Sequence, residues 1–164
     1  MVFPVNKARR QASSTLNPVS YGEKKMGYTY ADIELISVDD LALHRRGFLQ
    51  EEEIKRMRVT ALVDSGAHTL VINDHIKQQL DLAILEERTA RFADETEVRV
   101  EVVGPIEIHF ENRRTTVEAI LLPGNVEPLL GVIPMEDMDV IVDSKQQRLI
   151  VNPKNPNIPL VYIK

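Results

Sequence analysis

Asp64, Ser65 and Gly66 are the residues best placed to do chemistry in this chain, because they stand between two apolar runs. Val59 and Thr60, in the run before them, favour a β-strand. An aspartate at the end of a buried strand is costly unless something uses its charge. Ser65 can hydrogen-bond locally, and Gly66 allows a tight turn and a close approach to another group. The alternative is a solvated surface turn, and the apolar residues on both sides argue against it.

A second segment, Leu129-Leu130-Gly131, follows an apolar strand and a turn rich in proline and glycine. Together, and in this order, the two segments resemble the retropepsin-like aspartic proteases, and the chain looks closest to their single-domain bacterial members. The match to the catalytic loop of that family is Leu62-Val63-Asp64-Ser65-Gly66-Ala67. Leu129, Leu130 and Gly131 match the segment whose glycine lets a strand cross close to that loop. The resemblance covers roughly residues 28–164.

The resemblance implies that Asp64 is the catalytic residue and that Ser65, Gly66 and Ala67 support its loop. The chemistry needs two carboxylates: one takes a proton from the attacking water, and the other, protonated, supports the developing oxyanion. The sequence contains one Asp-Ser-Gly, so the second Asp64 would come from a second copy in an isologous homodimer. Asp143-Ser144-Lys145 lacks the glycine and is predicted to be an ordinary strand turn. Retroviral members place Arg-Asp after the downstream glycine, whereas Val132-Ile133 follows Gly131 here, so the dimer must be held differently.

Residues 88–103 have the pattern of a β-hairpin with a turn near residues 93–96. By resemblance this hairpin would be the flap that folds over a bound peptide, with the tip formed by Phe92, Ala93, Asp94, Glu95 and Thr96. The bacterial relatives usually carry an Asp-Gly turn at the tip, and Glu95 replaces that glycine. An ordinary surface hairpin is the alternative. We expect apolar side chains such as Leu62, Ile84 and Leu130 to line the substrate pockets.

The rest of the chain is rich in short apolar or alternating runs separated by turns, which predicts an all-β, closed β-barrel-like domain with the acid protease (retropepsin) fold. A charged segment, residues 39–53, interrupts the strands and is predicted to be a loop or excursion, with a helical turn as an alternative. One or two short helices are predicted, one after Asn73 and one from Pro134 to Met138. The predicted strands cover residues 28–38, 54–64, 71–72, 88–103, 105–110, 115–122, 139–143, 148–151 and 160–163.

The composition predicts a single domain, residues 26–164, preceded by a flexible basic tail, residues 1–25. The tail has a net charge of +4 against −5 for the whole chain. A natural pro-segment, a misassigned start and an expression remnant stay open as its origin, and self-processing near Gly22 to Tyr30 is a further expectation. The acidic balance argues against a nucleic-acid partner, and no apolar run is long enough for a membrane helix.

The sequence contains no cysteine, which fits a cytoplasmic location and leaves no thiolate metal site. No His-x-x-x-His or Asp-x-His spacing occurs, so we expect no metal and no cofactor. The function predicted on these grounds is a homodimeric aspartic endopeptidase whose partners are a second copy of itself and a peptide or protein substrate. The alternative is a non-catalytic peptide-binding or scaffold module on the same fold.

Overall fold

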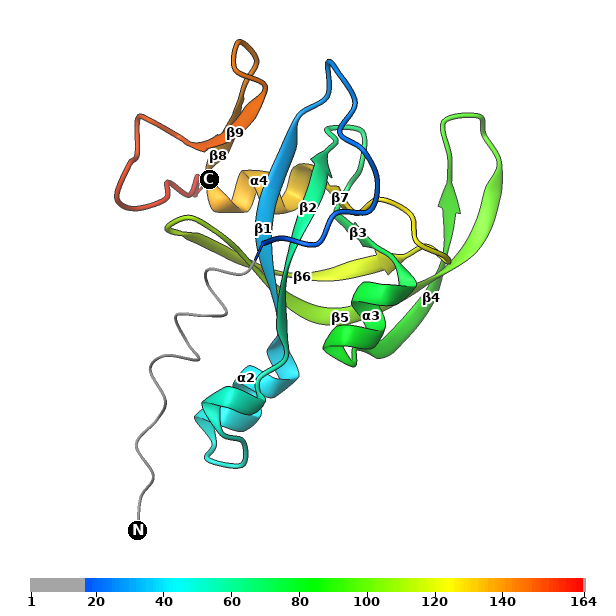
Figure 1. The fold of residues 1–164 in the computed structure, drawn as a ribbon, viewed down its shortest axis with the longest axis vertical. Coiled ribbons are helices and arrows are strands. Elements are labelled where there is room, and N and C mark those ends of the chain that lie inside the picture. Colours follow the sequence, from blue (N-terminus) through cyan, green and yellow to red (C-terminus); the bar gives the residue numbers. More distant parts are fainter. Residues whose placement is uncertain (1–16, 164) are drawn as a thin grey trace.

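The computed structural model describes residues 17–163, and they fold mostly as β-sheet with few helices (Figure 1). This confirms the prediction of a mainly β protein. The helical segments are short: α2 (Val38–Arg45), the 3₁₀ turn η1 (Glu51–Glu53), α3 (Asp74–Leu80) and α4 (Val132–Met138). The strands are β1 (Tyr30–Ser37), β2 (Arg56–Val63), β3 (Leu70–Ile72), β4 (Ala83–Arg91), β5 (Glu97–Phe110), β6 (Arg113–Leu121), β7 (Leu129–Leu130), β8 (Val140–Asp143) and β9 (Arg148–Val151).

The strands form a nine-stranded sheet in the order β4-β5-β6-β3-β7-β2-β1-β9-β8. β5 also pairs with β1, so the pairings from β5 through β6, β3, β7, β2 and β1 return to β5. β7, with two residues, is the shortest strand of this cycle and lies between β3 and β2. It runs parallel to β2 and antiparallel to β3, which brings three segments distant in sequence together at one point.

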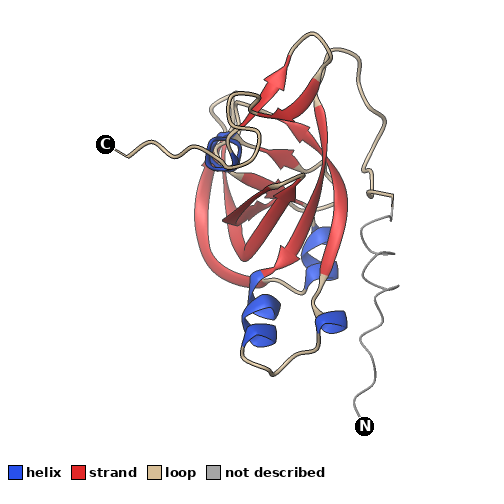
Figure 2. Cartoon of the chain, turned by 90° about the vertical axis from the view of Figure 1, so that its left-hand side faces the viewer, coloured by secondary structure: helices blue, strands red, loops and turns tan. Residues whose placement is uncertain are grey.

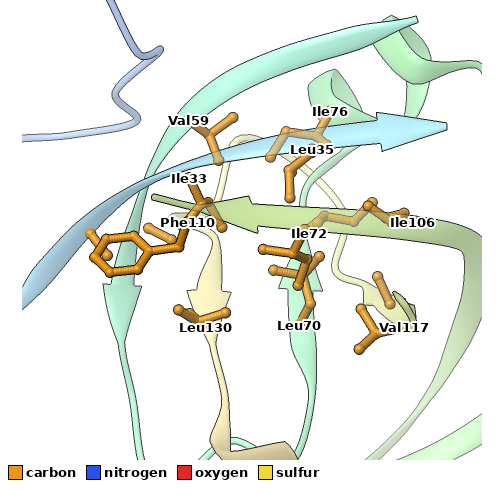
Figure 3. Close-up of a cluster of buried hydrophobic side chains, with 14 of the residues drawn as sticks. Ile33, Leu35, Val59, Leu70, Ile72, Ile76, Ile106, Phe110, Val117 and Leu130 are labelled. Atoms are coloured by element: carbon orange, nitrogen blue, oxygen red, sulfur yellow. The ribbon is translucent and has the colours of Figure 1, made fainter. Parts of the chain in front are cut away.

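The core lies inside this curved sheet, and every strand of the cycle contributes to it (Figure 3). The alternation of β6 shows how the sequence builds it, because each second residue from Arg113 to Leu121 is buried. α3 adds Ile76 and Leu80, which lie four residues apart and therefore share one helix face. The labelled core residues are Ile33, Leu35, Val59, Leu70, Ile72, Ile76, Ile106, Phe110, Val117 and Leu130.

Two helices begin at side-chain caps. The Asn73 side chain accepts a hydrogen bond from the Ile76 amide at 2.9 Å, which starts α3 where the sequence predicts a helix. α2 begins at Val38 and extends into residues 39–53, which we expected to be a charged loop or excursion, with a helical turn as an alternative. Ser37 accepts a bond from the Asp40 amide, and acidic residues in the first turn and basic residues in the last turn match the helix dipole. Figure 1 shows α2 at the opposite end of the molecule from the tip of the β4–β5 hairpin.

Two strand predictions need correction. Residues 160–163 form no strand; they follow Pro153, Pro156 and Pro159, which have no amide donor to offer to a sheet. Proline at Pro105, in contrast, does not end a strand: β5 continues through it, and only the register to β6 shifts between Val103 and Ile106.

The predicted tail falls partly outside the described residues, which begin at residue 17. Val19 is bonded to β2, donating to Arg58 O and accepting from the Thr60 amide, both at 2.9 Å. The Tyr21 hydroxyl lies 2.7 Å from Nδ1 of His75 on α3, and burial raises the pKa of Tyr21. Residues 17–21 are therefore attached to the sheet and to α3. In the described part of the chain, no helix has the length and apolarity to cross a membrane.

Candidate active site

Asp64 is the first residue after β2, and the end of that strand is fixed from both sides. The Val63 amide donates to Thr29 O at 2.8 Å, on the β1 side. The Asp64 amide donates to Leu130 O at 3.0 Å, on the β7 side. Backbone bonds to two different neighbours set the direction in which the chain leaves the sheet, and with it the position of the Asp64 side chain.

The residues after Asp64 form a tight turn around its carboxylate. The Gly66 amide donates to Asp64 Oδ1 at 2.8 Å, and the Ala67 amide donates to the backbone oxygen of Asp64 at 3.1 Å. Asp64 is half-buried, whereas Ser65 and Gly66 are exposed. The carboxylate is thus oriented by a backbone donor and still borders the solvent, as a group that must meet a substrate requires.

The chain after β7 crosses this turn at very short range, and Gly131 makes the crossing possible. A Cβ atom at residue 131 would lie 2.5 Å from Ala67 O and 2.8 Å from the Thr69 nitrogen, and closer still to Thr69 O. No side chain fits there. The φ angle of Gly131 is −92°, so the glycine is required by space and not by backbone conformation.

Further backbone bonds lock the two segments together. The Val132 amide donates to Ala67 O at 2.9 Å, and the Ile133 amide donates to His68 O at 3.0 Å. On the other side, the Thr69 hydroxyl donates to Glu118 O of β6 at 3.1 Å. The loop from Asp64 to Thr69 is therefore held by β6, by β7 and by the start of α4, which makes it a rigid platform for a reactive group.

The β4–β5 hairpin projects from the sheet, with its turn at the same end of the molecule as the end of β2 (Figure 1). Its tip closes through bonds from the Phe92 amide to Thr96 O and from the Glu95 amide to Phe92 O, both 2.9 Å. Asp94 Oδ1 accepts from the Thr96 hydroxyl at 2.6 Å and from the Thr96 amide at 3.0 Å. The bond from the Thr96 side chain, followed by the bond from its amide, lowers the pKa of Asp94.

Glu95 stands where the expected glycine is missing, and it adopts the left-handed conformation with φ = 67°. The turn geometry that a glycine would serve is therefore kept by a residue that bears steric strain in it. Exposed apolar side chains flank the tip, since Phe92 is 41% and Val98 44% exposed.

The three side chains that we expected to line substrate pockets differ in their exposure to solvent. Ile84 is 55% exposed on the edge strand β4, and Leu62 is half-buried. Leu130 is completely buried in the core, so the prediction that it contacts a substrate is wrong; β7 lies inside the sheet, and its side chain points into the core. Asp143, as predicted, belongs to a strand turn, where its carboxylate accepts from the Lys145 and Gln146 amides.

The sequence did not reveal the backbone acceptors of the loop, the carbonyl oxygens of Ala67, His68 and Leu130. Main-chain groups are the same at every residue, so a sequence cannot mark them, and only the glycine at 131 hinted at a close approach. The chain matches no model of a known protein family and no curated protein. The case for a function therefore depends on the loop itself.

Proposed function

We propose that this protein is an aspartic-type endopeptidase that acts as a homodimer, with one Asp64 from each subunit. The observation that carries the proposal is the Asp64 loop. The half-buried carboxylate of Asp64 is oriented by the Gly66 amide. The segment at Gly131 packs directly against the turn that carries it. The closed cycle of strand pairings supports assigning the sheet to the retropepsin type of β-barrel.

In this proposal the two Asp64 carboxylates face each other across the two-fold axis and share one proton. The ionised carboxylate takes a proton from water as the water attacks the peptide carbonyl, and the protonated one donates to the oxygen that becomes negative. The Gly66 amide keeps Asp64 Oδ1 in place at 2.8 Å, so little reorganisation is needed. The exposure of Ser65 and Gly66 leaves this surface open to a second copy.

We further propose that the β4–β5 hairpin is the flap that covers an extended peptide. Main-chain bonds to a strand would give affinity, and exposed apolar side chains such as Phe92, Ile84 and Val98 would favour hydrophobic residues near the cut. The cysteine-free sequence supports a reducing compartment, and we propose the cytoplasm.

The direct test compares Asp64→Asn with the wild type on a library of peptides, at acidic and neutral pH. We expect hydrolysis by the wild type, fastest at acidic pH where the pair holds one proton. The Asp64→Asn substitution should reduce hydrolysis by about 10²–10⁴-fold or more, because an amide cannot take the proton. An asparagine oxygen can still accept from the Gly66 amide, so the fold should survive.

Asp143→Asn is the matched control, since Asp143 also precedes a serine in a turn after a strand. It should keep full activity. Hydrolysis that survives in folded Asp64→Asn protein would refute the proposal. Peptide binding without hydrolysis in the wild type would favour the alternative, a non-catalytic peptide-binding module.

A further inference from the structure

Arg113, at the start of β6, is only 2% exposed, although it carries a charge. Asp40 is the other charged residue buried in the described part of the chain, and Lys55 satisfies it through its amide and its ammonium group. Arg113 Nη2 donates to Asn155 O, but Nε and Nη1 are buried and have no partner among residues 17–163. Buried donors of a charged group are expensive to leave unpaired.

The charge of Arg113 acts on the carboxylate of Asp139, but Asp139 accepts no hydrogen bond from the buried Nε and Nη1 atoms of Arg113. It accepts from Asn152 Nδ2 at 2.9 Å, from Asn155 Nδ2 at 2.8 Å and from the Leu160 amide at 3.0 Å. The Leu160 amide, then Asn152 and Asn155, with the Arg113 charge as a smaller influence, lower the pKa of Asp139. Asp139 therefore balances part of the charge of Arg113 without giving it a hydrogen bond.

Arg113 also lines a groove of about 600 Å³ between the β5–β6 turn and the C-terminal segment. Arg114, Asn112 and Thr116 add donors to this groove, and Pro159 and Val161 form its apolar wall. Two carboxylates, Glu111 and Asp137, line it as well, but both are exposed, so solvent and salt screen them more than the buried guanidinium. Asp137 in addition accepts from the Thr115 hydroxyl at 2.6 Å. Arg114 Nη1 is paired with Glu107 Oε1 at 3.1 Å. Arg113 is therefore the arginine of this groove that keeps buried donors without a partner among residues 17–163.

We propose that this groove binds a small oxyanion, a phosphate or a carboxylate group, with the guanidinium of Arg113 as its floor. Arginine suits this role because its planar group offers several donors to such oxygens. The ligand would pair the free Nε and Nη1 donors and relieve the cost of their burial. This site lies outside the Asp64 loop and does not depend on the proposed protease activity.

The wall over Arg113 can yield to an entering ligand. Residues 156–163 are exposed, and the segment has few polar attachments: the Leu160 amide donates to Asp139, and Pro156 O accepts from Asn112. Figure 2 shows the last residues leading away from the sheet. Binding should therefore shift the segment that faces Arg113 as well as the β5–β6 turn.

The test is a titration of the full chain, labelled with ¹⁵N, with phosphate and separately with acetate at constant ionic strength. We expect saturable shifts of the Arg113 Nε–H and of amides in residues 113–116 and 155–161. Arg113→Met should weaken binding about tenfold or more. Arg99→Ala, which removes an exposed arginine from β5, is the control and should leave it unchanged.

Arg113→Met removes the bond to Asn155 and can loosen the fold, so two other measurements keep the proposal testable. Arg113→Lys keeps the charge but loses the fork of donors, and it should also bind more weakly. In the wild type, an Arg113 Nε–H chemical shift that changes with neither anion would overturn the proposal. Chemical-shift changes that never saturate would overturn it too. Saturable shifts with both anions would show that a carboxylate group is sufficient for binding. Saturable shifts with phosphate alone would show that the site requires a phosphate group.

Discussion

Gly131 shows how much one residue without a side chain determines in this molecule. The backbone oxygens of Ala67 and Thr69 occupy the space that any Cβ would need. The same glycine precedes the amides of Val132 and Ile133, which bind the loop of Asp64 from behind. Position 131 thus couples the packing of β7 to the position of the candidate catalytic carboxylate.

Gly131→Ala should therefore destabilise the protein by about 1–3 kcal/mol or more, because the backbone around Thr69 must move to admit a methyl group. Urea unfolding measures this directly. Gly47→Ala is the control: nothing lies within 4 Å of a Cβ there, and its φ of +81° should cost only about 1 kcal/mol. Equal losses in the two variants would contradict the crowding argument.

At the scale of elements, the sequence correctly predicted the strands in which apolar and polar residues clearly alternate. It also correctly predicted the helix after Asn73. Gly131 and the Asp-Ser-Gly turn also pointed to the candidate site. What it could not predict depends on distant partners. Leu130 has the same apolar character as an exposed pocket residue, and only the position of β7 inside the sheet buries it. Residues 160–163 have β-forming side chains, yet they form no strand.

Arg113 shows how alternation along a strand can mark a buried charge. Positions 113, 115, 117, 119 and 121 are buried and alternate with exposed or half-buried positions on a single strand. Period-two patterning places Arg113 on the buried face. A charge assigned to a buried face marks an unusual environment even before a structure is seen.

The β4–β5 hairpin allows a prediction about pH. The folded pKa of Asp94 is lowered below its ordinary value of 3.8, chiefly by the Thr96 hydroxyl. The stabilisation of the tip is therefore fully present above 3.8 and is lost as the pH falls through the lowered value. An NMR titration of the Asp94 carboxyl should give a midpoint below 3.8.

Thr96→Val removes the hydroxyl and should move that midpoint back toward 3.8. Thr89→Val, on the same hairpin, changes a residue that has no part in the turn and should leave the midpoint unaltered. A wild-type midpoint at or above 3.8 would mean that the Asp94–Thr96 bonds do not hold the tip in solution.

For the molecule as a whole, the proposed chemistry requires two copies. Each chain supplies one Asp-Ser-Gly, and an obligate homodimer of this kind should bury on the order of 2,000 Å² in total. Sedimentation at micromolar concentration should therefore show a dimer, with Asp64→Asn and Asp143→Asn forming it equally well. A strictly monomeric protein would exclude the two-carboxylate mechanism under those conditions.

The most direct test mixes wild-type protein with Asp64→Asn at fixed total concentration, lets the subunits exchange, and follows hydrolysis of one peptide from the library. If each active site needs an Asp64 from both subunits, mixed dimers are inactive, and the activity falls as the square of the wild-type fraction. If each chain works alone, the activity falls in simple proportion to that fraction. A quadratic decline is the predicted result, and a linear decline would contradict a shared pair of Asp64 carboxylates.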